Sequence, residues 1–249
     1  MNTFTLYSLG VILALIVLPS LIILGWILYS DRKSKETWFS ILLCIATAFY
    51  TVGVSYYLGK FIVDKIIFLS FTNDIEFTIF KTLLLALVEE GAKLSILYLI
   101  VSRVKKFDDI YDGFVYSSIV GLSFATVETI LYVSREITIS NMIDLSIARL
   151  FTSLPLHLTC AIIMGYYVAI TRFSKKIGFK IENIIKALFI PGMVHFIYNL
   201  SVSLMSLYIK NIIVADIIII IAIMTLYVTG YVLLRKTIDL NKKFIKKKA

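Results

Sequence analysis

The chain has 249 residues, of which 59% are hydrophobic and only 16% are charged, with a mean hydropathy of +0.92. This balance excludes an ordinary soluble domain and favours a protein whose solvent is the bilayer. A spanning helix needs roughly 20 mostly apolar residues, so the length allows about seven or eight spans with short connections. We therefore expect residues 1–249 to form one all-α, multi-spanning membrane domain.

The net charge of +9 raises the question of nucleic-acid binding. The basic residues, however, lie mainly between apolar stretches and in the tail 241–248. Such placement indicates membrane orientation and contact with anionic lipid, with no nucleic-acid partner. The two cysteines, Cys44 and Cys160, both lie inside apolar stretches, so a disulfide framework is not expected.

Seven apolar segments are long enough to cross a membrane. They cover residues 4–29, 38–59, 77–101, 111–133, 147–170, 182–208 and 212–234. The apolar run from Leu6 to Leu28 is too long for the core of a cleaved signal, so we expect it to be the first span. The segment Phe61–Phe71 is too short to cross and contains Asp64 and Lys65. It predicts an interfacial or re-entrant helix, with extension of a neighbouring span as the alternative.

The connecting charges of this layout fall mainly on one side. That side receives Arg32, Lys33, Lys35, Arg103, Lys105, Lys106, Arg172, Lys175, Lys176, Lys180, Arg235, Lys236 and the lysine tail. The opposite side receives only Lys60, Lys65, Arg135 and Lys210. By the positive-inside rule the first side is cytoplasmic, so the N-terminus is expected outside and the C-terminus in the cytoplasm. Abundant Lys and Ile with little Ala is typical of a low-GC bacterium.

Ionisable side chains at membrane depth are costly and usually mark function. The third expected span contains Glu89, Glu90 and Lys93. Glu89 and Lys93 are one turn apart, and Glu90 lies about 100° around the helix from Glu89. One carboxylate can therefore pair with the lysine while the other stays free to act. The alternative is a charge network that only neutralises itself.

The fourth expected span carries Glu128 with no basic residue nearby on the same helix. Such an acid needs a distant partner or a proton, and a protonated glutamate bonded across helices is the alternative to a catalytic role. By the helical rise, Glu128 is expected about 10 Å nearer the outside than Glu90 and the histidines. If it stays that far away, its role is structural or indirect.

The only two histidines lie in the next two spans, His157 in the fifth and His195 in the sixth. Asn199 follows His195 by one turn, so both side chains can reach the same substrate atom. Proline precedes each histidine, at Pro155 and Pro191, and can open the backbone ladder and widen a polar cavity. Cys160 is a possible nucleophile or soft metal ligand, but we interpret it as packing.

In order and topology these features resemble the PrsW family of intramembrane proteases, which is grouped with the type II CAAX prenyl proteases. The matching elements are Tyr29-Ser30-Asp31-Arg32-Lys33, Glu89-Glu90-x-x-Lys93, Phe124-Ala125-x-x-Glu128, His157 and His195-x-x-x-Asn199. Thr129 and Tyr198 depart from the family, which often has Asn and Trp there. The resemblance implies a peptidase that cuts membrane-anchored proteins, the best known kind being an anti-sigma factor cleaved first on its extracytoplasmic side.

Two chemistries fit the candidate residues. In the first, Glu89 or Glu90 takes a proton from water, Glu128 and His157 orient the water, and His195 and Asn199 stabilise the oxyanion. In the second, His157, His195 and Glu128 hold zinc, and Glu89 or Glu90 is the general base. The sequence leaves both open. The metal-free version is favoured because the histidines lack the close spacing of a metalloprotease helix.

Two other classes of protein remain as alternatives. A transporter or proton-coupled channel also uses intramembrane acids and histidines, but it predicts polar residues across the whole membrane thickness and, commonly, inverted repeats. Here the polar residues gather toward one level, and no internal repeat is evident. A non-catalytic immunity or scaffold protein with a protease-like fold is the second alternative. It predicts that the glutamates and histidines are replaceable.

Overall fold

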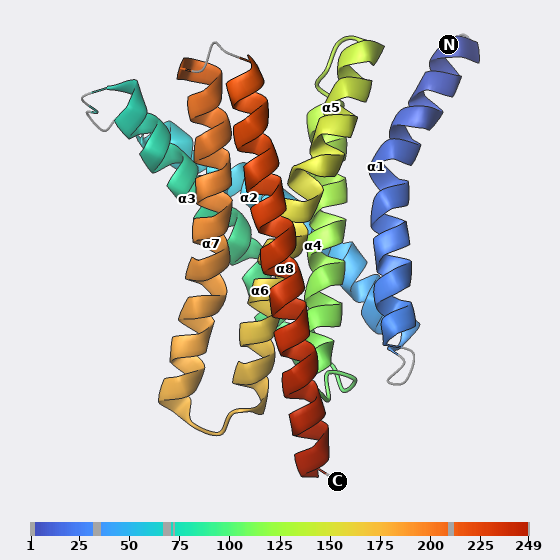
Figure 1. Ribbon diagram of the computed structural model, residues 1–249, viewed down its shortest axis with the longest axis vertical. Helices are drawn as coiled ribbons and strands as arrows, with labels where there is room; N and C mark the ends of the chain where they lie inside the picture. Colours follow the sequence, from blue (N-terminus) through green and yellow to red (C-terminus); the bar gives the residue numbers. More distant parts are fainter. Residues whose placement is uncertain (1–2, 32–35, 67–70, 72, 209–211, 249) are drawn as a thin grey trace.

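The computed structural model describes residues 3–31, 36–66, 71, 73–208 and 212–248. Over these residues the chain is helical and contains no strand. The helices are α1 (Thr3–Ser30), α2 (Trp38–Ile66), α3 (Asp74–Leu99), a 3-10 turn (Val101–Arg103), α4 (Ile110–Val133), α5 (Ile139–Phe151), α6 (Ser153–Phe173), α7 (Ile177–Tyr208) and α8 (Ile212–Lys248). Figure 1 shows them as one bundle with the two chain termini at opposite ends. The expected all-α class is confirmed.

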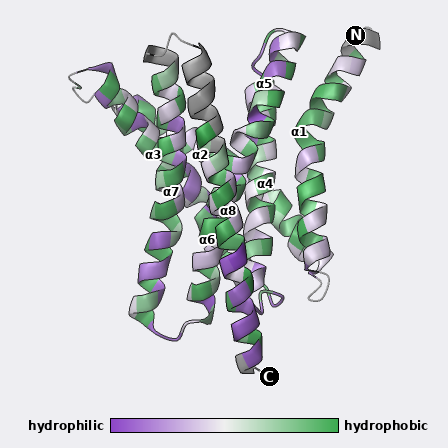
Figure 2. Ribbon diagram, in the orientation of Figure 1, coloured by the Kyte–Doolittle hydropathy of each residue, from purple (hydrophilic) through white to green (hydrophobic). Residues whose placement is uncertain are grey.

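Five described helical stretches are long and apolar enough to cross a membrane: Leu6–Ser30, Trp38–Lys65, Ile110–Val133, Ile139–Phe173 and Ile177–Met205. Figure 2 shows hydrophobic residues along much of these helices and hydrophilic residues toward the lower ends of α7 and α8. The α3 helix has 26 residues, but Glu89, Glu90 and Lys93 interrupt its apolar half. The chain is a multi-pass membrane protein.

The segment expected to be re-entrant instead continues the second span. The α2 helix runs without interruption through Ile66. After Gly59, the sequence from Lys60 to Ile66 contains neither proline nor glycine, so nothing in it stops a helix. The re-entrant prediction is wrong for residues 61–66, and the alternative of an extended neighbouring span is right. Residues 67–70 lie outside the described part, as do 32–35 and Lys210.

The expected fifth span is divided into two helices. The α5 helix ends at Phe151 and α6 begins at Ser153, with Thr152 between them. Pro155 explains the break because it has no amide hydrogen for the carbonyl group of Phe151. By contrast, Pro191 lies inside an uninterrupted α7. The break allows α5 and α6 to present Arg149 and His157 to the same place.

The two central helices, α4 and α6, approach so closely that only glycine fits at three positions. A Cβ atom on Gly165 would lie 2.1 Å from the Gly113 carbonyl oxygen, and one on Gly121 would lie 2.9 Å from the His157 carbonyl oxygen. Small residues permit such backbone contacts between membrane helices. This contact brings the Glu128 end of α4 beside the start of α6.

Candidate active site

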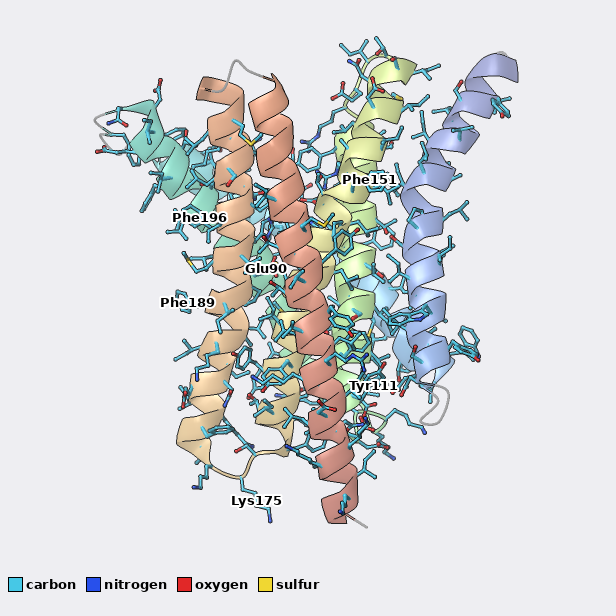
Figure 3. All side chains as sticks on the ribbon, viewed as in Figure 1. Glu90, Tyr111, Phe151, Lys175, Phe189 and Phe196 are labelled. Atoms are coloured by element: carbon cyan, nitrogen blue, oxygen red, sulfur yellow. The ribbon has the colours of Figure 1, made fainter. Side chains whose placement is uncertain are left out.

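Seven ionisable side chains from five helices meet inside the bundle, and we call them the intramembrane cluster. They are Glu89, Glu90 and Lys93 of α3, Glu128 of α4, Arg149 of α5, His157 of α6 and His195 of α7. Figure 3 labels Glu90 at the middle of the bundle. The structure therefore brings together every acid and histidine that the sequence predicted for the site.

Glu90 is the carboxylate that pairs with the lysine. Lys93 Nζ lies 2.6 Å from Glu90 Oε1, and His195 Nδ1 lies 2.8 Å from the same oxygen. Both Glu90 and Lys93 are fully buried. Because an ionised carboxylate only accepts hydrogen bonds, His195 donates through Nδ1, which leaves Nε2 free for another partner. Glu90 thus fixes the orientation of the His195 ring.

The distant partner of Glu128 is Arg149. Its guanidinium group donates to Glu128 Oε2, and it also donates to Thr129 Oγ1 at 3.0 Å and to Ser153 Oγ at 2.8 Å. Arg149 lies inside the expected fifth span, but 21 residues separate it from Glu128, so the sequence pattern alone does not connect the two. Thr129 departs from the family pattern, but its hydroxyl oxygen still accepts a hydrogen bond from the arginine that pairs with Glu128.

His157 joins the two ion pairs. Its Nε2 lies 2.9 Å from Glu128 Oε2, and its Nδ1 lies 3.0 Å from Lys93 Nζ. Since the lysine can only donate, Nδ1 accepts and Nε2–H donates to the carboxylate, which makes the ring a neutral imidazole. The Phe124 ring contacts both His157, at 4.9 Å between centroids, and the Lys93 ammonium group, at 4.4 Å. Phe124 thus packs against the polar cluster from α4.

The expected separation of Glu128 from the other site residues is not found. A hydrogen bond of 2.9 Å joins it to His157. The estimate assumed parallel spans of equal depth, whereas α6 begins only after the break at Thr152 and crosses α4 in close contact. Glu128 is therefore a direct member of the intramembrane cluster.

Among the described residues, Glu89 is the acid of the intramembrane cluster that pairs with neither lysine nor arginine. Lys93 and Arg149 pair with Glu90 and Glu128, which leaves Glu89 as the third acid. Its Oε2 is buried and has no hydrogen-bond partner among the described residues, and it lies 3.7 Å from His195 Nε2. That distance is too long for a hydrogen bond. Glu89 Oε2 and His195 Nε2 therefore face one another across a gap.

A cleft with a volume of about 330 Å³ reaches both Glu89 and Glu128. Its walls come from the second half of α2, the middle of α3, the second half of α4 and the residues just after α4. The end of α2, the start of α3 and the end of α4 lie toward the end of the bundle where α1 begins (Figure 1). Its charged lining residues, besides the two glutamates, are Lys60, Asp64, Lys81 and Arg135. The cleft therefore connects that end of the bundle to the Glu89 carboxylate.

Glu89, His157 and His195 form a possible metal-binding group, with ligand atoms that all lie within 4.8 Å of one another. Two ligands of one tetrahedral zinc ion are about 3.4 Å apart, close to the 3.7 Å between Glu89 Oε2 and His195 Nε2. The donor types and this spacing fit a metal. Ligation by His157 would replace one of its two present contacts. The expected ligand set included Glu128, which instead faces Arg149 and His157.

The remaining candidates lie just outside the intramembrane cluster. Asn199 is half-buried on α7, one turn beyond His195. Cys160 is fully buried, packs with Leu156 and Leu226, and has its Sγ 3.5 Å from the Pro191 carbonyl oxygen. This environment agrees with the packing interpretation of the cysteine.

Comparison with known proteins identifies the family. Residues 22–229 match the family described as PrsW family intramembrane metalloprotease. Protease PrsW of Oceanobacillus iheyensis is 29% identical over 186 residues, which cover 73% of this chain and 78% of the relative. Protease PrsW of Clostridioides difficile is 28% identical over 187 residues, covering 74% and 76%. A third relative, Protease PrsW of Geobacillus kaustophilus, is 38% identical over 91 residues, covering 36% and 38%.

No solved structure matches the chain. The interpretation as a transporter or channel finds no support among the relatives, which are all named as proteases. The family match spans most of the chain and includes every residue of the intramembrane cluster. The chain therefore belongs to the PrsW family of intramembrane metalloproteases and is a peptidase.

Proposed function

We propose that the intramembrane cluster hydrolyses a peptide bond in a membrane-anchored protein and that Glu89 is its central residue. One observation carries this proposal: of three buried glutamates, two are paired with cations, whereas Glu89 lines the cleft with an unpartnered oxygen. A carboxylate held in this way can accept the proton of an attacking water. The substrate would enter the cleft from the end of the bundle where α1 begins.

The other residues hold and complement this centre. Glu90 fixes the His195 ring, so that Nε2 points toward Glu89. Protonated His195 and the amide of Asn199, one turn apart on α7, would donate hydrogen bonds to the oxyanion of the tetrahedral intermediate. Arg149 and Glu128 hold the His157 ring from the opposite side. Lys93 compensates the negative charge of Glu90.

The description of the family as metalloproteases adds a candidate metal, for which zinc is the natural choice. Glu89, His157 and His195 would hold it. When bound, zinc lowers the pKa of a water molecule and polarises a carbonyl group. With or without the metal, Glu89 stands at the reacting centre, as a ligand or as the base. Removal of divalent metals distinguishes the metal-dependent mechanism from the metal-free one.

We further propose that the N-terminus lies outside and the C-terminus in the cytoplasm. The basic loops and the lysine tail support this orientation through the positive-inside rule, and the tail would contact anionic lipid. The cleft then faces the extracytoplasmic side. A membrane-bound anti-sigma factor, cut there first, is the substrate class that the family resemblance suggests. No role in nucleic-acid binding is proposed.

The test is cleavage of a library of membrane-anchored reporters by the purified protein in detergent. Wild type is compared with Glu89→Gln and His195→Ala, each with and without a zinc chelator, and Glu182→Gln on the exposed start of α7 is the control. We expect both site variants to lose cleavage and the control to keep it. Chelator sensitivity supports the metal-dependent mechanism, and insensitivity supports the metal-free mechanism with Glu89 as the base. Cleavage at the wild-type rate by Glu89→Gln rejects the proposal.

A further inference from the structure

A second group of buried acids lies at the opposite end of the bundle from the N-terminus. Asp31 directly follows α1, Glu36 precedes α2, and Asp112 lies in the first turn of α4. Their carboxylate oxygens come within 4.8 Å of one another. Figure 3 labels Tyr111, the residue before Asp112, near the lower end of the bundle, well below Glu90. We call these three residues the junction cluster because they join α1 and α2 to α4.

Two carboxylates of the junction cluster, Glu36 and Asp112, are held in place by hydrogen bonds, and all three acids have an oxygen without a partner among the described residues. Asp112 Oδ2 accepts hydrogen bonds from the backbone amides of Asp108, at 2.6 Å, and Asp109, at 2.7 Å. The Tyr116 hydroxyl group donates to Glu36 Oε2. The oxygens Asp31 Oδ2, Glu36 Oε1 and Asp112 Oδ1 are buried and have no hydrogen-bond partner among the described residues.

The charge of the junction cluster is not balanced by a direct ion pair in the described part of the chain. Asp31 is 7% exposed and Asp112 is completely buried. Burial raises the pKa of Asp31 to about 7; Glu36, Asp109 and Asp108 act in the same direction, and Lys106 opposes them. Burial also raises the pKa of Glu36, although its hydrogen bonds oppose the change. A group of this kind needs a positive ligand or protons.

We propose that Asp31, Glu36 and Asp112 bind a hard divalent cation of the Mg²⁺, Mn²⁺ or Ca²⁺ type. Such ions prefer carboxylate oxygens, and waters complete their coordination. Three unpartnered oxygens from three different segments supply the ligands that one ion would share. The ion would fasten the α1–α2 junction to the start of α4. This site shares no residue with the intramembrane cluster and does not depend on its proposed chemistry.

Binding is measured on the full chain, purified in detergent and freed of metals with a chelator that is then removed. Mn²⁺ is titrated while free Mn²⁺ is followed by electron paramagnetic resonance. We expect Asp31→Asn and Glu36→Gln each to weaken one binding event at least tenfold. Asp239→Asn, which removes an exposed acid from α8, should leave it unchanged. His195→Ala should also leave it unchanged, which separates this ion from any metal at the intramembrane cluster.

Thermal unfolding gives an independent measurement. Saturating Mg²⁺ should raise the unfolding midpoint of the wild type by roughly 5 °C, and this rise should vanish in Asp31→Asn. Asp112 also caps α4, so Asp112→Asn is used only if it folds. Equal Mn²⁺ binding by wild type and both variants overturns the proposal. The proposal is also overturned if wild type binds none of the three cations and Asp31→Asn has a higher unfolding midpoint than wild type. The junction cluster would then hold protons instead of an ion.

Discussion

The molecule buries two groups of three carboxylates, and they are neutralised differently. In the intramembrane cluster, Lys93 and Arg149 lie in direct contact with Glu90 and Glu128. In the junction cluster, the described partners are backbone amides and the Tyr116 hydroxyl group, none of which carries a charge. The first group therefore has one net uncompensated acid, Glu89, and the second has three.

This difference separates two uses of a buried acid. Ionised groups in low dielectric are stable only when paired, coordinated or neutralised by a proton. The intramembrane cluster contains nearly all of its own counter-charges, so the single acid left over is available for chemistry. Among the described residues the junction cluster has no ion pair with a cation, and its arrangement suits an ion that enters from solution. The following predictions test this contrast, beginning with the largest effect.

Replacing Glu89 should abolish chemistry while leaving the fold intact. Glu89→Gln keeps the size of the side chain but removes its charge, and we expect kcat for a cleaved reporter to fall about 10³-fold. The thermal midpoint should change little because Glu89 faces the cleft and makes no ion pair with a cation. Glu36→Gln, the matched change in the junction cluster, should leave kcat within a factor of two. A similar loss in both variants would contradict the division of roles.

Removing the internal counter-charge should have the largest effect on stability. Lys93→Met leaves Glu90 buried and uncompensated, which costs about 3 kcal/mol or more of unfolding free energy. The double variant Lys93→Met with Glu90→Gln should recover part of this loss. Lys186→Met breaks the exposed Glu182–Lys186 pair and should cost less than about 1 kcal/mol. Denaturant unfolding in detergent gives these values, and equal losses for the two lysines would refute the pairing.

Arg149 should affect the rate through Glu128 and His157. Arg149→Lys keeps the charge but removes the planar guanidinium group, whose nitrogens donate hydrogen bonds to Glu128, Thr129 and Ser153. We expect about a tenfold fall in kcat with little change in KM and a shifted pH profile. Arg172→Lys, at the exposed end of α6, is the control. An unchanged pH profile would mean that Arg149 only stabilises the helix.

The sequence predicted the composition of the intramembrane cluster because charge in lipid is rare enough to be informative. Glu89, Glu90, Glu128 and both histidines stood out by type and position alone. Their partners did not, since a hydrogen bond between Glu128 and Arg149 depends on where α4 and α5 cross. The choice of Glu90 over Glu89 as the partner of Lys93 depends on helix rotation, which a composition pattern does not determine.

The helix ends were harder to predict for a related reason. Hydropathy finds one apolar stretch over Ile139–Phe173 and does not detect the break at Thr152 inside it, because the break depends on the backbone hydrogen bond that Pro155 cannot make. The continuation of α2 through residues 61–66 was predicted only as the alternative, because the charged residues Asp64 and Lys65 were interpreted as the end of a span. The junction cluster was missed entirely: Asp31, Glu36 and Asp112 lie near expected loops, where single acids are ordinary.

The smallest predicted effect is the pH dependence of stability that the junction cluster imposes. Asp31 has a pKa of about 7 in the folded protein against 3.8 ordinarily, so the folded state binds the proton more tightly. Stability from this group is then present at low pH and is lost as the pH rises from about 4 to 7. In chelator, Asp31→Asn should have a thermal midpoint about 3 °C above wild type at pH 8, and a smaller advantage at pH 5. Saturating Mg²⁺ should remove the advantage, since the ion replaces the proton in wild type. Parallel midpoints for wild type and Asp31→Asn from pH 5 to 8 would show that the Asp31 charge is already compensated.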